Sequence, residues 1–407
     1  MRMGRARRLT FRARGALRLQ YPVPRSIRSF IELCLGLGWA TEGGPPQPKN
    51  RKTYRTETLT IPNHAKQEEV TMATIFPVGK LPLELMRRLL DFPIPDPRVR
   101  LGPGIGLDAA VVDMGDRCLV VKADPITFAT DAIGWYAVQI NANDIATTGA
   151  LPRWMMAILL LPEGRTDVDL VERIFQQLRS ACEALGITLI GGHSEVTYGL
   201  DRPIIAGFML GEVHPDRLIT PRGARVGDRV ILSKPIAIEG TSVIAREKRA
   251  ELLPIFGETF LERCADFLYN PGISVLEDAQ IALRAGRVHA MHDPTEGGLA
   301  TGLWELARAA GLGIRVDREA VPIYPETLAL CQHYRLDPWG LLASGSLLIV
   351  APPEDAPAIR DALIAAGRAA AIIGELRPVE EGEWIEHDGR REPLQPFPRD
   401  ELARLFE

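Results

Sequence analysis

No uninterrupted apolar run in the sequence reaches the roughly 20 residues that a membrane-spanning helix needs. The five cysteines are odd in number and form no CxxC pair, which argues against a disulfide framework and against a structural zinc. The 48 basic and 52 acidic side chains nearly cancel, so no overall field favours nucleic acid or an anionic membrane as partner. We therefore expect a soluble, cytoplasmic protein that acts on a small molecule.

Two common nucleotide-binding motifs are also missing. The segment GPGIGLDAAVVD spaces Gly102, Gly104 and Gly106 as GxGxG before a strand, whereas a dinucleotide fingerprint is GxGxxG before a helix. No GxxxxGK[ST] occurs, so any ATP is bound without a P-loop. A tight turn is the ordinary interpretation of such glycines. They also permit a ligand to approach the backbone amides, which makes Gly104 and Gly106 candidate cofactor-binding residues.

The first 72 residues do not resemble a folded domain. The first thirty contain nine arginines and no acid, and residues 41–72 are rich in Pro, Thr, Lys and Gln without periodicity. A targeting segment, a basic binding arm and a start codon assigned too early are the three interpretations. We favour the third, because Met72 precedes a typical helix start in which Pro82 suits the first turn.

From Gly79 onward, strand and helix patterns alternate, which indicates an α/β (α+β) fold. Two helices are predicted over about 133–148 and 169–185, the second ending at Gly186. A polar, Pro- and Gly-containing stretch over 214–227 then precedes the strand RVILSKP, so we place a domain boundary there. The expected organisation is an extension, two domains and a tail, with boundaries 1–72, 73–215, 216–378 and 379–407.

Three aspartates carry the strongest chemical signal. Asp108 and Asp124 lie at strand ends, while Asp144 shares a predicted helix with Asn141 and Asn143. Each acid taken singly has a structural interpretation. Polar groups in an apolar helix must be satisfied by backbone, by water or by a bound cation and phosphate, and carboxylates are the oxygen ligands that Mg²⁺ prefers. The sequence thus predicts Asp108, Asp124 and Asp144 as Mg²⁺ ligands, with Asn141 and Asn143 binding the nucleotide.

Two further segments hold candidate residues. In LIGGHSEVT, His193 and Glu195 follow a strand and two glycines, so we assign them to the acceptor side of the reaction as catalytic candidates, although a histidine on a turn is more often only hydrogen-bonded. In HDPTEGGL, a helix N-terminus favours an anion. An ordinary capping box explains Asp293 without a ligand but explains Gly297 and Gly298 less well, so all three are candidate cofactor-binding residues.

The ordered motifs GPGIGLDAAV, KAD, NANDIATTGALP, GGHSEVT, GDRVILSKP, HDPTEGGL and ASGSLLI resemble those of the AIR synthase (PurM)-like superfamily, and of HypE in particular. The likeness spans about residues 79–378. It implies a PurM-like two-domain fold, an N-terminal domain that forms a β-barrel with a partner copy, and ATP with Mg²⁺ as cofactors. Aspartates matching Asp108, Asp124 and Asp144 belong to the phosphate and metal site of such families, whose members activate an amide or similar oxygen with the γ-phosphate.

Departures from the individual families leave the acceptor open. HypE acts on a carbamoyl group carried by a C-terminal cysteine, whereas this sequence ends DELARLFE and its last cysteine is Cys331. VGKLP lacks the reactive cysteine of selenophosphate synthetase, and His193 replaces an aspartate of thiamine-monophosphate kinase. We expect an ATP- and Mg²⁺-dependent, homodimeric phosphoryl-transfer, ligase- or dehydratase-type enzyme. A small-molecule kinase and a non-catalytic nucleotide-binding regulator are the alternatives.

Overall fold

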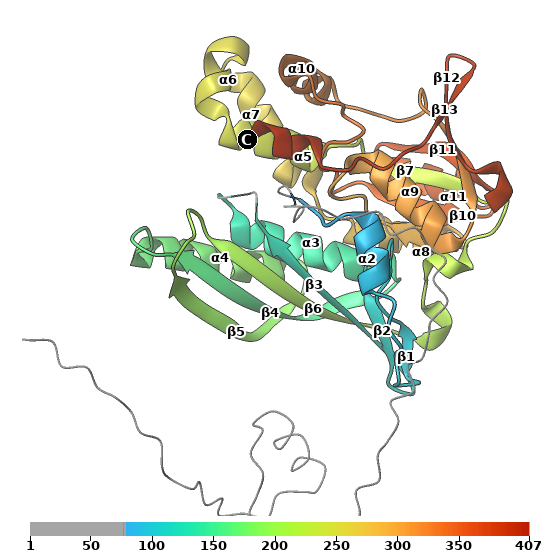
Figure 1. The fold of residues 1–407 in the computed structure, drawn as a ribbon, viewed down its shortest axis with the longest axis horizontal. Helices are drawn as coiled ribbons and strands as arrows, with labels where there is room; N and C mark the ends of the chain where they lie inside the picture. The colour runs from blue at the N-terminus through green and yellow to red at the C-terminus, as the bar shows by residue number, and fades with distance from the viewer. Residues whose placement is uncertain (1–75, 77–78, 128, 130, 407) are drawn as a thin grey trace, which may run out of the picture. The chain divides into compact units, whose positions relative to one another are not determined.

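The computed structural model describes residues 76, 79–127, 129 and 131–406. The predictions for residues 1–72 lie outside this part of the chain. Thr74–Glu407 form one compact unit that contains two β-sheets with their helices (Figure 1). The fold is therefore the mixed α/β type that the alternating pattern indicates. No described helix is long and apolar enough to cross a membrane.

The first sheet has six strands in the order β1-β2-β3-β6-β4-β5. All neighbours are antiparallel except β4 and β5, which are parallel. The parallel pair follows from the helix between them, since a parallel connection needs a crossover. The strands are β1 Val99–Leu101, β2 Ala110–Asp113, β3 Cys118–Ile126, β4 Leu151–Pro162, β5 Thr188–Thr197 and β6 Ile204–Val213.

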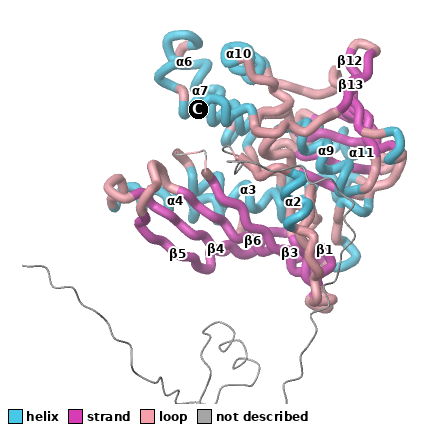
Figure 2. Tube along the Cα trace, in the orientation of Figure 1, coloured by secondary structure: helices cyan, strands magenta, loops and turns pink. Residues whose placement is uncertain are grey.

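Two helices, α3 (Ile133–Thr147) and α4 (Val168–Ala184), cover one face of this sheet (Figure 2). Almost every residue of α3 is buried, whereas α4 buries only one apolar stripe. Gly134 allows the two helices to touch, because a Cβ there would lie 2.8 Å from the Ile174 carbonyl oxygen. Both helices agree with the predicted ranges. In α4, Asp167 accepts the amide hydrogen of Leu170 as an N-cap.

The second sheet has seven strands in the order β13-β12-β9-β11-β7-β10-β8. Residues of β7 and β10 alternate between the two faces, one packed against α9 and the other against α8 and α11. The last two strands fall within residues 379–407, the predicted tail. The strands are β7 Arg229–Ser233, β8 Ala290–His292, β9 Gly313–Asp317, β10 Leu347–Ala351, β11 Ala370–Arg377, β12 Glu383–His387 and β13 Arg390–Pro393.

The remaining elements are helices and helical turns (Figure 1). They include 3-10 turns in the polar stretch where the domain boundary was predicted. Helices α8, α9 and α11 pack on the second sheet, whereas α5, α6, α7 and α10 share a core cluster with the first sheet and α3. The elements are α2 Leu83–Leu89, η1 Pro215–Arg217, η2 Pro221–Gly223, α5 Ile238–Glu247, α6 Arg249–Phe256, α7 Glu258–Asp266, η3 Leu268–Gly272, α8 Leu276–Ala285, α9 Gly298–Ala310, α10 Pro325–Tyr334, α11 Ala356–Ala365, η4 Val379–Glu381 and η5 Glu401–Leu405.

The predicted start of α9 is wrong. Asp293 is not its N-cap, since the helix begins at Gly298 and Gly297 precedes it with a φ of 82°. Gly298 also has a positive φ, and a Cβ there would lie 2.4 Å from the Trp339 carbonyl oxygen. These two glycines displace the helix start by several residues. Asp293 therefore does not cap α9, and its carboxylate lies near Asp108 and Asp144 instead.

Candidate functional site

Three carboxylates from separate elements converge at one point. Asp108 lies in the loop between β1 and β2, Asp144 lies on α3, and Asp293 directly follows β8. One carboxylate oxygen from each lies within 4.8 Å of those of the other two. We call these residues the aspartate cluster. It joins the first sheet, its covering helix and the edge of the second sheet.

The aspartate cluster brings three acidic groups together in a largely buried place. The exposed fractions of Asp144 and Asp293 are only 3% and 1%. Burial raises the pKa of both carboxyl groups well above the usual range, and the neighbouring carboxylates raise it further. Neither carboxylate oxygen of Asp293 has a hydrogen-bond partner among the described residues. Buried acceptors without partners are unfavourable, and the three acids supply the hard oxygen ligands that a divalent cation such as Mg²⁺ needs.

Lys122 connects Asp124 to the aspartate cluster. The two residues are two positions apart on β3 and therefore share a face of the strand. Lys122 Nζ lies 3.2 Å from Asp124 Oδ2 and 3.3 Å from Asp144 Oδ2. Burial opposes the charge on Lys122, but Asp144 and Asp124 together raise its pKa above the usual value. Asp124 thus sits beside the cluster, paired to the lysine.

On the opposite side, His292 holds Asp108. His292 Nδ1 lies 2.8 Å from Asp108 Oδ1, and its Nε2 lies 3.3 Å from Glu305 Oε2 on α9. Burial opposes the imidazolium, yet Asp108 and Glu305 raise the pKa of His292 well above its ordinary value. The contact with His292 holds the Asp108 carboxylate beside the other two acids of the cluster.

Asn141 and Asn143 use their amides on the backbone. Asn141 Oδ1 accepts the amide hydrogen of Asp124 at 3.0 Å, and its Nδ2 donates to the Ala137 carbonyl oxygen at 2.9 Å. Asn143 Nδ2 donates to the Ile273 carbonyl oxygen, and its Oδ1 accepts from the Val275 amide, both at 2.8 Å. These bonds position α3 against β3 and against the segment before α8. Nucleotide binding by either asparagine stays a prediction.

The predicted glycines lie around α9. Gly106 has a φ of 70°, and a Cβ there would lie 2.5 Å from the Glu305 carbonyl oxygen, so the loop before Asp108 rests directly on this helix. Gly104 accepts the amide hydrogen of Leu107 in the same loop. The close packing of Gly106 on α9 holds the loop, and thereby Asp108, next to the second sheet.

At the start of α9, the side chain of Asp400 accepts a backbone hydrogen bond. Asp400 Oδ2 accepts the amide hydrogen of Gly297 at 2.7 Å. Its Oδ1 accepts from the amides of Leu402 at 2.7 Å and Leu342 at 3.3 Å. Burial raises the pKa of Asp400 to about 7, against these three hydrogen bonds. The anion-favouring position predicted near Gly297 and Gly298 therefore holds a carboxylate from the C-terminal segment.

His193 and Glu195 lie away from the aspartate cluster within one chain. They pair in register with Ile158 and Leu160 of β4, on the face that points away from α3. Asp124 is three strands distant from β5, about 14 Å at the usual strand spacing. His193 Nε2 lies 3.3 Å from Glu195 Oε2, and both side chains are largely exposed. Their catalytic role stays a prediction.

The sequence interpretation missed the charged partners of the acids. Lys122, His292 and Glu305 were not singled out, and neither was Lys80, whose Nζ lies 3.2 Å from Glu296 Oε2 and from Thr295 Oγ1. Period-two alternation on a strand places Lys122 beside Asp124 and was an available signal. No local pattern connects His292 to Asp108 or Glu305, because their contacts join distant segments.

Comparison with known proteins identifies the family. Residues 106–213 match the N-terminal domain of AIR synthase related protein, and residues 225–385 match its C-terminal domain. Together the two matches cover more than half of the chain. The chain belongs to the AIR synthase related family. In this family member, Asp108 and Asp144 fall in the first matched domain and Asp293 in the second.

Relatives of this AIR synthase related protein carry enzyme names. Carbamoyl dehydratase HypE of Rhizobium leguminosarum bv. viciae is 33% identical over 257 residues, which is 62% of this chain and 70% of the relative. A selenide, water dikinase of Pelobacter propionicus is 28% identical over 323 residues, 70% of this chain and 88% of the relative. The chain is an enzyme of the family.

Solved structures agree with the predicted PurM-like fold. Hydrogenase maturation protein HypE in complex with ATP has a TM-score of 0.61 at 25% identity, covering 78% of this chain and 94% of the other. A thiamine monophosphate kinase of Aquifex aeolicus has a TM-score of 0.57 at 21% identity, covering 76% and 97%, and shows likeness of fold alone. The α/β fold with N- and C-terminal domains is confirmed, whereas the barrel shared with a partner stays a prediction.

Proposed function

We propose that this enzyme transfers the γ-phosphoryl group of ATP to an oxygen acceptor, with Mg²⁺ held by Asp108, Asp144 and Asp293. The observation that carries the proposal is the buried aspartate cluster, in which Asp293 has no hydrogen-bond partner within the described chain. The HypE relatives and the ATP complex of HypE support the choice of ATP. Bound Mg²⁺ would supply neutralisation of phosphate charge, which is the main requirement of phosphoryl transfer.

The proposed site differs from the predicted one in one ligand. Asp293 takes the place of Asp124 in the proposed cation site, because the carboxylate oxygens that lie within 4.8 Å of one another come from Asp108, Asp144 and Asp293. The half-buried Lys122 and the exposed Lys80 place two cations in this region, and each carries a raised pKa, Lys122 through Asp144 and Asp124 and Lys80 through Glu296. They hold positive charge near the point where triphosphate would lie. Asp124 keeps Lys122 in place.

The transfer step does not require the protein to form a covalent bond with the substrate. An acceptor oxygen forms a bond to the γ-phosphorus, the bond from that phosphorus to the bridging oxygen breaks, and ADP departs with the electron pair. The proton of the acceptor leaves to a base or to water. In a carbamoyl acceptor, later loss of the activated oxygen as phosphate amounts to dehydration. This chemistry relies on positioning and charge, which the cluster and its lysines provide.

The acceptor that the relatives favour is a carbamoyl-type group, as in the reaction named for carbamoyl dehydratase HypE, with a place in hydrogenase maturation. A small-molecule kinase is the second candidate, and the observation in its favour is the fold shared with thiamine monophosphate kinase. Product analysis with each class of acceptor distinguishes the two, since the first yields a dehydrated product and free phosphate whereas the second yields a phosphorylated acceptor.

We also propose a homodimer formed through the first sheet. Its face opposite α3 and its edge strand β5 carry apolar side chains, with exposed fractions of 39% for Met156, 52% for Ile190 and 57% for Val196. An edge strand exposed on both faces leaves backbone groups available for pairing. A second copy, whose identical strand offers the same apolar residues, fits this surface. His193 and Glu195 would then lie at the interface.

The test is isothermal titration of the full chain with a non-hydrolysable ATP analogue, with and without Mg²⁺. We expect Mg²⁺-dependent binding that Asp293→Asn and Asp144→Ala abolish. Asp116→Asn, an exposed aspartate in the turn before β3, is the matched control and should bind like the parent. Binding that is unchanged in Asp293→Asn would contradict the assignment of Asp293, and absence of binding by folded parent protein would refute the proposed function.

A further inference from the structure

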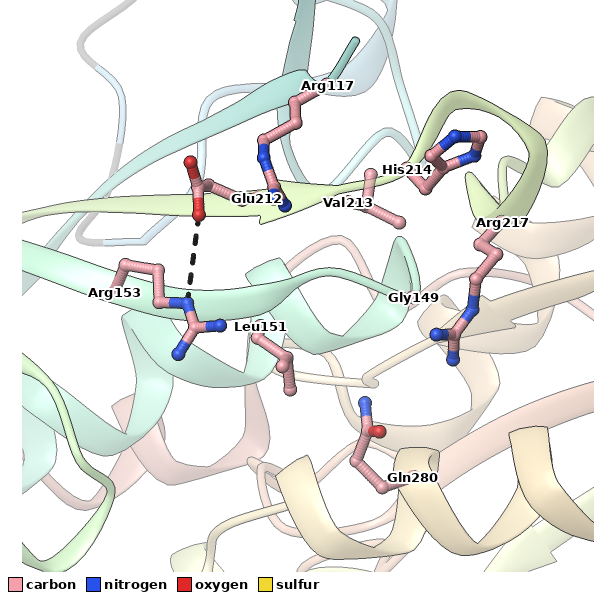
Figure 3. A pocket seen from close by; sticks show the side chains of 9 residues that line it. All are labelled: Arg117, Gly149, Leu151, Arg153, Glu212, Val213, His214, Arg217 and Gln280. Atoms are coloured by element: carbon pink, nitrogen blue, oxygen red, sulfur yellow. Dashed lines mark ion pairs between the residues drawn. The ribbon is translucent and has the colours of Figure 1, made fainter.

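A second charged site lies at the end of the first sheet where β4 begins and β6 ends. Most of its charged side chains are arginines, in contrast to the acids of the aspartate cluster. The site is a cavity of about 180 Å³ between the ends of β4 and β6, the turn η1 and helix α8 (Figure 3). Arg117, Arg153 and Arg217 surround it, and Figure 3 shows their side chains coming from three different segments. We call it the arginine pocket. The other polar side chains that line it are Glu212, His214 and Gln280.

The arginine pocket has an excess of positive charge. Among the described residues, Arg117 and Arg217 have no ion-pair partner, and Arg153 reaches Glu212 only at 3.9 Å. Glu212 is the single carboxylate of the lining, set against three guanidinium groups. Excess positive charge of this kind, gathered around a hollow, attracts an anion that carries about two negative charges.

Hydrogen-bond donors also outnumber acceptors in the lining. His214 Nδ1 accepts the amide hydrogen of Asp216 at 3.3 Å, which leaves Nε2 as the nitrogen that carries hydrogen in the neutral ring. Gln280 adds an amide, and each guanidinium offers a planar fork of donors that matches phosphate oxygens. The chemistry of the lining therefore selects an oxyanion rather than a cation or an apolar ligand.

The backbone fixes this arrangement. The register of β4 against β6 shifts between Pro152 and Trp154, and such a bulge re-aims the intervening side chain, here Arg153. Gly149, which ends α3, has a φ of 77°, and a Cβ there would lie 2.9 Å from the Arg217 carbonyl oxygen. The turn carrying Arg217 thus rests on the end of α3, and the position of its backbone does not depend on a bound ligand.

We propose that the arginine pocket binds a small ligand through a dianionic phosphoryl group, as in a phosphate monoester. The volume equals that of about six water molecules in the liquid, which suits such a group and is too small for a nucleoside triphosphate. Two arginines contacting one phosphate bidentately give both charge and directional complementarity. The site is independent of Mg²⁺, since its positive charge is supplied by side chains.

The experiment titrates the full chain with inorganic phosphate, pyrophosphate and glycerol 3-phosphate in EDTA at low ionic strength, followed by calorimetry. Without a divalent cation, the aspartate cluster repels anions, so binding in EDTA reports the arginine pocket. We expect saturable binding that weakens as salt is raised. Arg117→Gln and Arg217→Gln should each weaken it about tenfold or more, because each removes a charge-assisted contact.

A matched control checks that the effect belongs to the arginine pocket. Arg179→Gln changes an exposed arginine on α4 and should leave binding unchanged. Arg117 and Arg217 are themselves exposed, so the Gln variants are expected to fold, which an unaltered thermal midpoint verifies. The proposal is overturned if folded parent protein binds none of the three ligands at millimolar concentration, or if both Gln variants bind as tightly as the parent. Neither result bears on ATP binding in Mg²⁺.

Discussion

A carboxylate oxygen of Asp293 lies within 4.8 Å of one from Asp144, although the first residue follows a strand of the second sheet and the second lies on the helix covering the first sheet. Both side chains are almost completely buried, and burial raises the pKa of each. Like charges this close oppose each other unless a cation or a proton intervenes. The proposed metal site therefore lies directly at the junction of the two sheets.

The first prediction is that Asp293→Asn raises stability without metal but lowers turnover with Mg²⁺ and ATP. Asp293→Asn removes a buried acid that lacks a hydrogen-bond partner, so in EDTA we expect the thermal midpoint to rise, with a gain of roughly 1 kcal/mol. In Mg²⁺ and ATP, the same variant should lose turnover. Calorimetric melting and phosphate release measure the two effects. A lower midpoint in EDTA would show that Asp293 is stabilised by contacts other than a metal.

The second prediction concerns Lys122. Its ammonium group lies between Asp124 and Asp144, so Lys122→Met leaves the half-buried Asp124 and the buried Asp144 without their counter-charge. We expect a loss of about 3 kcal/mol in the free energy of unfolding, measured by urea denaturation. The double variant Lys122→Met with Asp124→Asn should recover part of that loss, because one unpaired acid is also removed. Strictly additive effects would mean that the pair is not coupled.

The third prediction is a pH dependence at Glu239, a buried residue of α5. Burial raises the pKa of Glu239 to about 8, whereas an unfolded glutamate titrates near pH 4. The folded protein keeps the proton that the unfolded chain releases, so the contribution of this group to stability is complete below about pH 4 and is lost as pH rises toward 8. We expect Glu239→Gln to become more stable than the parent at pH 9.

Melting curves from pH 5 to pH 9 check this prediction. Glu172→Gln on the exposed face of α4 is the matched control, and its midpoint should follow that of the parent at every pH. Parallel curves for Glu239→Gln and the parent would mean that Glu239 is ionised in the folded state at neutral pH.

The fourth prediction concerns the C-terminal segment. Asp400 accepts three backbone amide hydrogens, from Gly297, Leu342 and Leu402. Asp400→Ala leaves these donors unsatisfied, and we expect a loss of about 2 kcal/mol with faster proteolysis near the C-terminus. Hydrogen exchange at the three amides is the direct measurement. Glu380→Ala, at an exposed position, is the control, and equal exchange rates in both variants would argue against the contact.

The fifth prediction tests the proposed dimer. A lysine at Val196 on the edge strand places charge on the apolar surface, so Val196→Lys should convert the dimer into a monomer of unchanged secondary structure. Light scattering after size-exclusion chromatography measures the mass. Val168→Lys changes a valine on α4 that is at least as exposed, and it should leave the mass unchanged. A parent protein that is already monomeric at high concentration contradicts the proposal.

Sequence periodicity predicted the local elements of the fold well. The ranges of α3 and α4 agree closely with the predicted ones, and β3 and β7 coincide with strong β-forming runs. Each of these elements has its signal in its own residues, as in the apolar stripe of α4 and its glycine stop. The start of α9 was missed because two glycines with positive φ override the capping pattern in HDPTEGG.

The candidate site was less predictable, because its contacts join distant segments. Spacing alone singled out Asp108, Asp124 and Asp144 for the cation site, and it placed Asp293 at a helix N-terminus as a candidate cofactor-binding residue. Which acids meet depends on how β8 lies against α3, and nothing local encodes that distance. His193 and Glu195 illustrate the same limit, since the face on which they lie follows from the register of β5 with β4.

The two asparagines of α3 have a consequence for how the enzyme can move. Asn141 ties the helix to β3, and Asn143 ties it to the segment between η3 and α8. Both attachments lie within one turn of Asp144 on the same helix. They restrict the movement of this carboxylate relative to the two segments that α3 joins, so Asp144 is anchored from two sides through its neighbours.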